Sequence, residues 1–535
     1  MSNMPKVFIA DDVNEDKLAP LVDAGIDVAK ETGLAPGELV KRLADADGVI
    51  VRSATKLTAE IMDAAPNLRV IGRAGVGVDN IDVAAATARG IVVMNAPDGN
   101  TITTAEHAFA LIVAMCRNVP QAHAKLQAGT WDKKSFVGVE LHGKTLGVIG
   151  LGRIGKHVSR IARGFGMNVV AYDPFCSSEA AAELGISMAS LDDVFAKADI
   201  LTIHTPVTDE TRGIIGRDAL AKMKRGVRIV NAARGGLVDE AALIEALDEG
   251  KVAGAALDVF ETEPLPADSP LLGRSNVITT PHLGASTAEA QQGVALTVAE
   301  QMRDLLIDGV LRGAVNAPAI EPAEAEALRP FMELGERLGR FQAQITANSS
   351  IAEIRLEYAG ELVDKTTAPI TRAFLAGLLR DVSARVNAVN ASLIAEERGI
   401  EVIVQTSSTT KPGSPDIRTV VRTNDGEQAV AGLVFAGGES RITEIGSFSI
   451  EVGPAEGGGT QHLLVTKNHD VPGVIGQIGT SLGQAEVNIS HFYLGRKERG
   501  GEALAVIEVD SPVSDEALSA LSSIPAVILV RQVRL

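Results

Sequence analysis

Short apolar runs alternate with amphipathic stretches over the first hundred residues of the chain. Residues 7–10, 48–51, 69–71 and 91–94 have the length and composition of buried strands. The stretches between them, 15–24, 37–44, 59–65 and 83–89, have the apolar spacing that is typical of helices. This alternation predicts a parallel sheet with helices on both faces. A longer helical pattern then runs from 103 to about 127, interrupted by Pro120.

A second unit of the same kind begins at Lys144. Its expected strands are 145–149, 168–172, 200–205, 228–231, 254–257 and 277–280. The helical stretch 288–308 is predicted to return to the first unit, because residues 1–100 lack a closing helix of their own. The two units therefore predict an α/β protein with two doubly wound parallel sheets, flavodoxin-like in the first unit and Rossmann-type in the second.

The pattern changes after residue 317. Residues 318–330 are rich in Ala, Glu and Pro and are predicted to form a linker. An α+β unit is expected from there to about 455, with helices at 331–346 and 368–399, and a second linker at 452–460. The remaining residues show strands at 462–466, 487–493, 503–509 and 526–533, and helices at 472–484 and 514–522. That β-α-β-β-α-β order predicts a ferredoxin-like domain.

Composition narrows the function classes. The chain has 535 residues, 46% of them hydrophobic, and a formal net charge of −18. This charge argues against nucleic acid as a partner. The two Cys cannot form a disulfide scaffold, and no apolar run is long enough to span a membrane. We therefore expect a cytoplasmic protein that binds neither nucleic acid nor membrane. No motif of metal-ligand spacing occurs, so no metal is expected.

A glycine-rich loop follows the strand expected at 145–149. Gly150, Gly152 and Gly155 have the G-x-G-x-x-G spacing and open a helix. Such glycines allow a tight turn, close approach of the pyrophosphate and close helix–strand packing. Asp173 ends the next strand, where a carboxylate accepts hydrogen bonds from the ribose 2′-hydroxyl and repels a 2′-phosphate. The loop therefore predicts NAD, rather than NADP, as the cofactor.

Three further strand ends carry polar side chains, Arg234, Glu263 and His282. Ligands of open α/β sheets bind beyond the carboxyl ends of the strands, so these residues are expected at one cleft. Arg can hold a carboxylate with two hydrogen bonds, and His can take a hydroxyl proton near neutral pH. A carboxylate behind the His fixes its tautomer. The set suits oxidation of a hydroxy acid.

The segments GLGRIG, NAARGGLVD, ALDVFETEP and TTPHLGAST resemble the signature blocks of the D-2-hydroxyacid dehydrogenases. The C-terminal half resembles the intervening domain and the ACT domain of a long form of that family. The resemblance implies a substrate-binding domain at 1–100 and 286–317, an NAD-binding domain at 101–285, an intervening domain at 318–455 and a regulatory ACT domain at 460–535. It also implies a homodimer or homotetramer.

The resemblance assigns a role to each matched position. Arg234 would hold the substrate carboxylate, and His282 would be the acid/base, supported by Glu263. The implied cofactor residues are Gly150, Gly152, Arg153, Ile154, Gly155, Asp173, Thr205, Ala232, Ala233, Asp258, Gly284 and Ala285. The implied substrate is the small molecule 3-phosphoglycerate, whose charge requires a basic cleft. The expected substrate residues are Arg52, Ser53, Lys56, Arg73, Asn100 and, reaching a neighbouring subunit, Lys133.

Two further questions stay open. Asp470 and Asn488 match the positions at which ACT domains bind an effector, which the resemblance implies to be L-serine. The alternative is an ACT domain that serves only for assembly. For the catalytic part, the alternatives are the same chemistry on 2-oxoglutarate, hydroxypyruvate or glyoxylate, and a non-catalytic NAD(H)-sensing protein.

Overall fold

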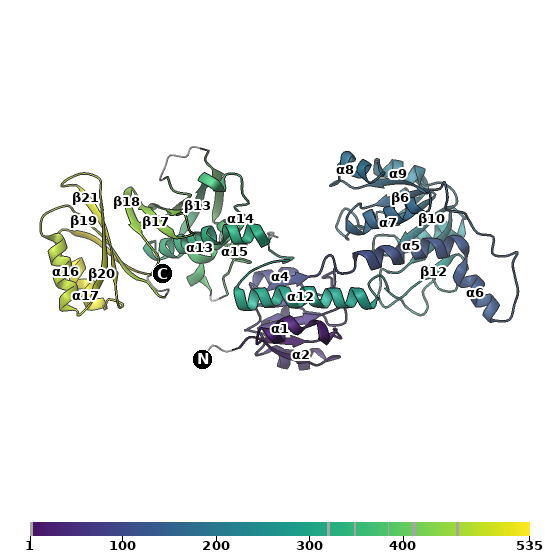
Figure 1. Ribbon diagram of the computed structural model, residues 1–535, viewed down its shortest axis with the longest axis horizontal. Coiled ribbons are helices and arrows are strands. Elements are labelled where there is room, and N and C mark those ends of the chain that lie inside the picture. The colour runs from purple at the N-terminus through teal and green to yellow at the C-terminus, as the bar shows by residue number, and fades with distance from the viewer. Residues whose placement is uncertain (1–3, 318–321, 347–348, 384, 409–413, 456–458) are drawn as a thin grey trace.

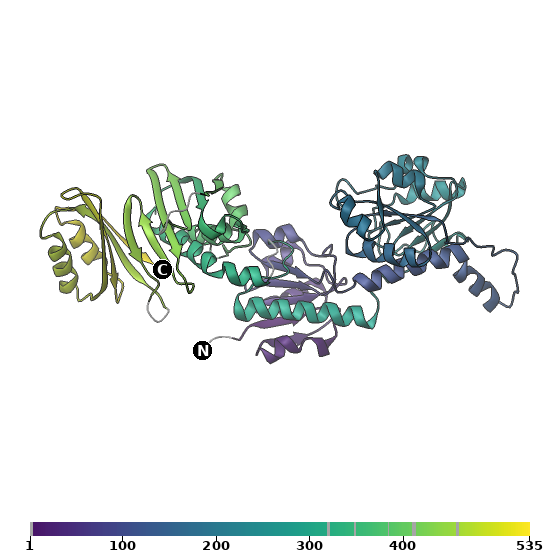
Figure 2. The same ribbon diagram turned by 45° about the horizontal axis from the view of Figure 1, so that its top comes forward.

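The computed structural model describes residues 4–317, 322–346, 349–383, 385–408, 414–455 and 459–535. The molecule is elongated, and its units follow one another along the long axis (Figure 1). The unit that contains residues 101–285 lies at one end and the C-terminal unit lies at the other (Figure 2). Within the described ranges, no helix is both long and apolar enough to cross a membrane.

The first sheet is parallel, with the strand order β2-β1-β3-β4-β5. This is the expected flavodoxin-like fold, with an edge strand, β2, that the pattern of the sequence does not predict. Its strands are β1 (Lys6–Ile9), β2 (Asp27–Lys30), β3 (Gly48–Val51), β4 (Val70–Arg73) and β5 (Val92–Asn95). Its helical segments are η1 (Glu15–Lys17), α1 (Ala19–Asp23), α2 (Pro36–Leu43), α3 (Ala59–Asp63) and α4 (Val83–Ala88).

One face of this sheet is covered from far along the chain. The helix α12 (Ala288–Asp308) lies across it beside α1 (Figure 1). Val298, Ala299 and Met302 of α12 are fully buried in the same core as Val7, Val70 and Met94 of the sheet. The segment after α12 then returns to β5, where the Asn316 side chain accepts a hydrogen bond from the Val93 N–H at 2.9 Å.

The second sheet is also parallel, in the order β12-β11-β10-β9-β6-β7-β8, and the reversal of strand order lies between β6 and β9. Its strands are β6 (Thr145–Ile149), β7 (Asn168–Tyr172), β8 (Ser187–Met188), β9 (Ile200–Ile203), β10 (Val227–Asn231), β11 (Val252–Leu257) and β12 (Val277–Thr279). The helices α7 (Arg153–Gly164), α8 (Ser178–Glu183), α9 (Leu191–Lys197), α10 (Arg217–Lys222) and α11 (Glu240–Asp248) surround it. The prediction of two doubly wound α/β units is confirmed.

Two helices lead from the first unit into the second, α5 (Thr101–Arg117) and α6 (Val119–Gln127). The break between them lies at Asn118, which has a left-handed φ of 52°, whereas Pro120 sits in the first turn of α6. Proline is tolerated in a first turn because that position has no intrahelical N–H partner to lose. The interruption expected at Pro120 therefore lies slightly earlier in the chain.

The third unit has a mixed sheet in the order β14-β13-β15-β16-β17-β18. Its strands are β13 (Ile351–Tyr358), β14 (Glu401–Thr406), β15 (Ile417–Thr423), β16 (Gly426–Val434), β17 (Ser440–Ile445) and β18 (Phe448–Val452). Its helical segments are α13 (Pro322–Ile345), η2 (Gly360–Leu362), α14 (Ala368–Leu378), η3 (Arg380–Val382) and α15 (Ala391–Glu397).

Two expectations for this unit are wrong. The linker expected at 318–330 is helical from Pro322 onwards, and Pro330 lies inside α13. Leu328, Leu334 and Phe341 of α13 are fully buried, and their burial offsets the cost of the internal proline. The single helix expected at 368–399 is two helices, α14 and α15, with η3 between them. Residues 318–321 of the first expected linker and 456–458 of the second lie outside the described residues.

The last unit contains β19 (His462–His469), α16 (Val474–Gln484), β20 (Ile489–Arg496), β21 (Glu502–Val509), α17 (Asp515–Ser522) and β22 (Val527–Arg534). Its antiparallel sheet has the order β20-β21-β19-β22, which confirms the ferredoxin-like prediction. The two helices cover one face of the sheet. The other face, which includes Leu463, Val506 and Val533, is buried in one core with α13 and β18, so the two C-terminal units pack as one body.

Candidate functional site

The glycine loop lies at the switch point of the second sheet, between β6 and α7. Gly150 has a left-handed φ of 89°, and a side chain there would meet the His204 carbonyl oxygen at 2.6 Å. A side chain at Gly155 would overlap the Gly150 carbonyl. Gly152 forms the N-cap of α7 with open space around it. The loop thus exposes the N-terminus of α7, where backbone N–H groups can bind a phosphate.

Unsatisfied polar atoms mark the strand ends around this loop. Among the described residues, the buried Thr205 Oγ1 and His204 Nδ1 at the end of β9 have no hydrogen-bond partner. Buried polar atoms without partners are costly, so these atoms indicate a ligand that supplies hydrogen bonds. Ala232 and Ala233 follow the neighbouring strand β10. This donor and acceptor set fits a dinucleotide.

Asp173 joins the glycine loop to the end of β7. Its Oδ2 accepts a hydrogen bond from the Leu151 N–H at 2.7 Å, and its Oδ1 accepts one from the Phe175 N–H at 2.8 Å. The carboxylate therefore holds the loop and retains lone pairs for a ribose hydroxyl. Arg153, at the start of α7, forms an ion pair of 2.7 Å with Asp98 of the first unit, and Ile154 packs on the core beneath the loop.

A histidine–carboxylate pair lies beyond β11 and β12. The His282 Nδ1 is 2.7 Å from Oε2 of Glu263, and the other carboxylate oxygen accepts a hydrogen bond from the Phe260 N–H at 3.0 Å. An ionised Glu263 can only accept, so Nδ1 carries the proton and the half-exposed imidazole offers a free Nε2. This arrangement gives His282 the tautomer of a general base.

Asp258 fixes the loop that carries His282. It is fully buried, and its carboxylate accepts hydrogen bonds from the Leu283 and Gly284 N–H groups, both at 2.8 Å. Burial alone would raise the pKa of Asp258, but the hydrogen bonds from His107, Thr280 and the Leu283 amide outweigh it, and the pKa lies below its usual value. Ala285 lies half-buried at the end of this loop.

Cationic side chains from both units lie close to one another. Arg234, on the loop after β10, forms an ion pair of 3.2 Å with Asp79 of the first unit. Arg73, at the end of β4, is close enough to Arg234 and Arg52 for their positive charges to repel its own. Burial, reinforced by the Arg234 charge, lowers the pKa of Arg73 to about 10, so it remains a cation at neutral pH. Its Nε is buried and has no partner among the described residues.

The other residues that the sequence predicts for the substrate differ in their surroundings. Ser53 and Lys56 are exposed on the loop after β3. Asn100 precedes α5, and its buried Oδ1 has no partner within the described part of the chain. Lys133 is exposed on the loop after α6, beside Trp131, which is 85% exposed. Among the described residues, Lys133 forms no hydrogen bond or ion pair with Arg52, Arg73 or Arg234, so a role for it depends on a second copy of the chain.

The two residues predicted for an effector do not meet within one chain. The Asp470 Oδ2 accepts hydrogen bonds from the Gly500 N–H and from Arg496, which hold the pKa of Asp470 below its usual value. Asn488 instead bonds to Asp510 at 2.8 Å. The strand register puts these pairs at opposite ends of β20, and an eight-residue strand spans about 25 Å. One small ligand can touch both residues only across two ACT domains.

Sequence reasoning missed three residues that shape the site. Asp79 pairs with Arg234. The buried Asp11 accepts hydrogen bonds from the Arg52 and Thr55 N–H groups at 2.6 and 3.2 Å, which fixes the loop after β3. His107 of α5 contacts Asp258 at 3.1 Å. These contacts join residues that are distant in the chain, so no local sequence motif indicates them. No cluster of metal-binding type occurs among the described residues.

Sequence profiles agree with the fold and the site. Residues 109–284 match the NAD-binding domain of the D-isomer specific 2-hydroxyacid dehydrogenases. Residues 327–446 match the D-3-phosphoglycerate dehydrogenase intervening domain, and residues 462–526 match the ACT domain. Fold and site together define the class, an NAD-dependent dehydrogenase of the D-isomer specific 2-hydroxyacid type.

Full-length relatives narrow the class further. The chain is 43% identical to the D-3-phosphoglycerate dehydrogenase of Archaeoglobus fulgidus, with 98% of each chain covered. It is 40% identical to that of Bacillus subtilis, with 99% of this chain and 100% of the relative covered. The chain therefore belongs to the D-3-phosphoglycerate dehydrogenase family, which confirms the resemblance seen in its motifs, and its cofactor is NAD.

Solved structures match the catalytic part. A glyoxylate reductase from Paecilomyes thermophila aligns with a TM-score of 0.55 at 31% identity, over 59% of this chain and 99% of that chain. The apo-structure of D-lactate dehydrogenase from Escherichia coli aligns with a TM-score of 0.53 at 27% identity, over 58% of this chain and 99% of that chain. This level of agreement supports the shared fold of the first two units.

Proposed function

We propose that this protein oxidises D-3-phosphoglycerate to 3-phosphohydroxypyruvate with NAD, the first step of the phosphorylated route to L-serine. The observation that carries the proposal is the convergence of Arg52, Arg73 and Arg234 beside the loops of the His282–Glu263 pair. The loop after Arg234 packs against the segment that leads to Glu263, because a side chain at Gly235 would overlap the Phe260 carbonyl. The full-length relatives carry the name of this activity.

The proposed chemistry assigns one task to each group. Arg234 holds the substrate carboxylate and the C2 oxygen through its guanidinium. The free Nε2 of His282 takes the proton of the C2 hydroxyl, and Glu263 stabilises the resulting imidazolium through Nδ1. When NAD is bound, its nicotinamide ring accepts the hydride from C2. Arg52 and Arg73, with Lys56, Ser53 and Asn100 at the edge of the cleft, bind the phosphate.

The cofactor assignments follow the same loops. We propose that the exposed N-terminus of α7 binds the pyrophosphate, that Asp173 binds the ribose, and that Thr205 uses its unpaired hydroxyl. Asp258 acts through the loop that it holds, because its carboxylate is fully buried. The remaining proposed cofactor residues line these loops: Gly150, Gly152, Arg153, Ile154, Gly155, Ala232, Ala233, Gly284 and Ala285.

The domain division is part of the proposal. The packing of α12 on the first sheet supports a substrate-binding domain of residues 1–100 and 286–317 around an NAD-binding domain of 101–285. An intervening domain of 318–455 and an ACT domain of 460–535 follow. We expect the cleft between the first two domains to be the place where the basic groups and the glycine loop meet one substrate and one cofactor.

Substrate specificity is tested by neutralising the phosphate site. A protein with Arg52→Gln and Arg73→Gln loses two charged contacts, each worth roughly 1.5–3 kcal/mol. Its kcat/KM for D-3-phosphoglycerate should fall by more than about 100-fold, while the reduction of unphosphorylated hydroxypyruvate is retained. If both substrates lose activity equally, the two arginines do not select the phosphate. If the wild-type protein prefers hydroxypyruvate, the substrate is a different 2-oxo acid.

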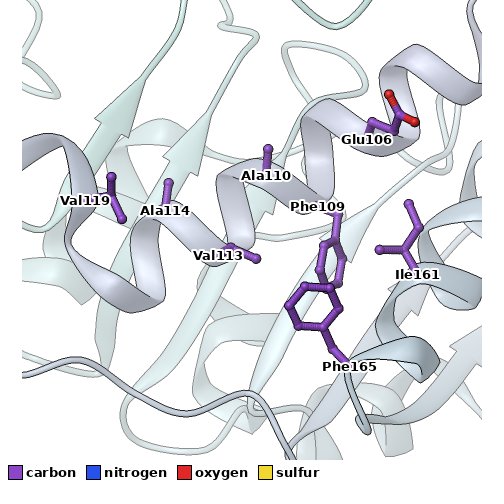
Figure 3. A pocket seen from close by; sticks show the side chains of 8 residues that line it. All are labelled: Glu106, Phe109, Ala110, Val113, Ala114, Val119, Ile161 and Phe165. Carbon is purple, nitrogen blue, oxygen red and sulfur yellow. The ribbon is translucent and has the colours of Figure 1, made fainter.

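A second copy of the chain is part of the proposed active form. A groove of about 450 Å³ lies along α5 and α7, lined by Phe109, Val113, Val119, Ile161 and Phe165 (Figure 3). Val119 and Phe165 are half-exposed, and the loop after α6 exposes Trp131 and Val137 by more than 80%. A homodimer that inserts this loop into the partner's groove would cover both surfaces and carry Lys133 toward the partner's cleft.

The assembly is checked by light scattering after size-exclusion chromatography. The wild-type protein should elute as a dimer or tetramer, and Trp131→Ala combined with Val137→Asp should shift it toward a smaller species. An unchanged size would exclude this loop from the interface.

The effector is tested by adding L-serine to the turnover assay. Inhibition of the wild-type protein that Asp470→Ala removes would support a serine site. If L-serine does not inhibit turnover, the ACT domain serves for assembly alone.

A further inference from the structure

The first turns of α5 hold the loop that carries His282. The Thr104 hydroxyl donates a hydrogen bond of 2.9 Å to the Gly284 carbonyl, and the Thr103 hydroxyl lies 3.1 Å from that of Thr287. One turn further along, the His107 Nε2 lies 3.1 Å from Oδ1 of Asp258. Thr104 and His107 are three positions apart and so share one face of the helix. Neither residue is among those that the motifs of the sequence single out.

The contact with His107 compensates a buried charge. Asp258 has no exposed surface, and an ionised carboxylate in that position needs a full set of donors. The Thr280 hydroxyl donates a hydrogen bond of 2.6 Å to Oδ1 of Asp258, so toward the His107 Nε2, 3.4 Å away, it can act only as an acceptor. The His107 Nε2 therefore carries a hydrogen and donates a hydrogen bond to the Asp258 carboxylate. Without this donor, one side-chain contact that keeps Asp258 ionised is lost.

Asp258 in turn fixes an unfavourable backbone. His282 has a left-handed φ of 55°, which costs a residue with a side chain roughly 1–2 kcal/mol. The His282 N–H donates to the Asp258 carbonyl at 2.9 Å, and the next two amides donate to the Asp258 carboxylate. These bonds hold the imidazole where Nδ1 meets Glu263. A backbone in a rarely populated conformation persists only while its surroundings impose it.

We propose that His107 is a positioning residue for the reaction, acting on His282 through Asp258. The inference rests on the proposed dehydrogenase function and adds a residue from a helix that leads out of the first unit. Because α5 begins where the first unit ends, the same helix connects the loop that carries His282 to the first unit. His107 itself needs no contact with the substrate or NAD for this role.

The test compares variants of the full-length protein. His107→Leu removes the donor, whereas His107→Gln keeps an N–H that can reach Asp258. With D-3-phosphoglycerate and NAD, kcat of His107→Leu should fall about 10- to 100-fold, since a lost hydrogen bond to a charged group has that effect. The KM for substrate and the Kd for NADH, measured by fluorescence, should stay within about threefold. His107→Gln should recover most of the lost kcat.

Two further variants make the result specific. Thr104→Val keeps the shape of the side chain and removes its bond to Gly284, so kcat should fall in the same way and by less. His123→Leu, on the exposed surface of α6, should behave as the wild-type protein. A His107→Leu protein with wild-type kcat would overturn the proposal, as would an equal loss in His107→Gln. Absence of turnover in the wild-type protein would instead overturn the proposed function.

Discussion

Asp173 has two tasks that a single substitution can separate. It supports the glycine loop through the Leu151 N–H and presents a carboxylate to the ribose site. Asp173→Asn keeps an acceptor for the loop and removes the charge that repels a 2′-phosphate. We expect Asp173→Asn to bring the Kd values of NADPH and NADH within about tenfold of each other, as measured by fluorescence titration. Unchanged discrimination would remove Asp173 from cofactor selection.

The buried His204 should make the stability of the second unit depend on pH. Burial lowers the pKa of His204 from 6.5 to about 4, so the folded protein holds it neutral. The unfolded chain binds a proton there first, so the stabilisation is complete above pH 6.5 and is lost as the pH falls from 6.5 to 4. The loss reaches roughly 3 kcal/mol. The melting temperature of His204→Gln should fall less steeply over this range than that of the wild-type protein, and parallel curves would contradict the account.

At this scale the sequence predicts residues whose roles follow from a strand end. The sequence predicts the roles of Gly150, Gly155 and Asp173, because the strands of a parallel sheet have their carboxyl ends at one edge. The sequence does not predict the roles of Asp79 and His107, because each acts through a contact with a residue about 150 positions further along the chain. No spacing along the chain records such a contact.

The packing of α13 against α14 depends on glycines. A side chain at Gly339 would overlap the Phe374 carbonyl, and one at Gly377 would overlap the Glu336 carbonyl, so the two helix backbones touch. Gly339→Ala should destabilise the C-terminal units by about 1–3 kcal/mol, because backbone atoms cannot move aside cheaply. Gly479→Ala in α16, where nothing lies within 4 Å, should be neutral or stabilising. Equal denaturation midpoints for both variants would contradict the close packing.

The elements that the sequence predicts best are long or strongly patterned. Most parallel strands of both catalytic units and the C-terminal β-α-β-β-α-β order follow from apolar periodicity. Two edge strands are missed: three of the four residues of β2 are exposed and carry little apolar pattern, and β8 has only two residues. The start of α13 is missed because Pro330 indicates a break, whereas the buried stripe of that helix decides the outcome.

The C-terminal body docks on the first unit through one short segment. Val389 is buried in the core of the first sheet, the Asn387 side chain donates to the Gly90 carbonyl at 2.7 Å, and that of Asn390 donates to the Ala88 carbonyl at 3.4 Å. These bonds satisfy carbonyls at the C-terminal end of α4. Because the two C-terminal units share a core, this contact joins both of them to the first unit.

Breaking that contact should free the C-terminal body without touching the active site. Val389→Asp combined with Asn387→Ala should raise amide hydrogen exchange at α4 and increase the radius of gyration measured by X-ray scattering. Turnover without an effector should be retained, because neither residue lies near the cleft. Val404→Asp, on the exposed edge strand β14, is the control. Unchanged exchange and scattering would show that the contact does not hold the units together.

The shape of the whole molecule follows only partly from the sequence. The number and order of the units can be predicted, because each has its own pattern. The shared core of the last two units depends on the sheet face that includes Leu463 and Val506. The apolar periodicity shows that this face is buried, but it does not show which element covers it. The docking segment 385–390 lies between two helices and carries no motif, so only the structure reveals it.

The central claim is that Nε2 of His282 takes a proton from D-3-phosphoglycerate as NAD is reduced. The most direct measurement is NADH formation by purified protein with NAD and D-3-phosphoglycerate at alkaline pH, compared with His282→Asn. The wild-type protein should turn over, and His282→Asn should lose about 10²- to 10⁴-fold in kcat while it still binds NADH. Wild-type turnover by His282→Asn, or no turnover by a wild-type protein that binds NADH, would contradict the account.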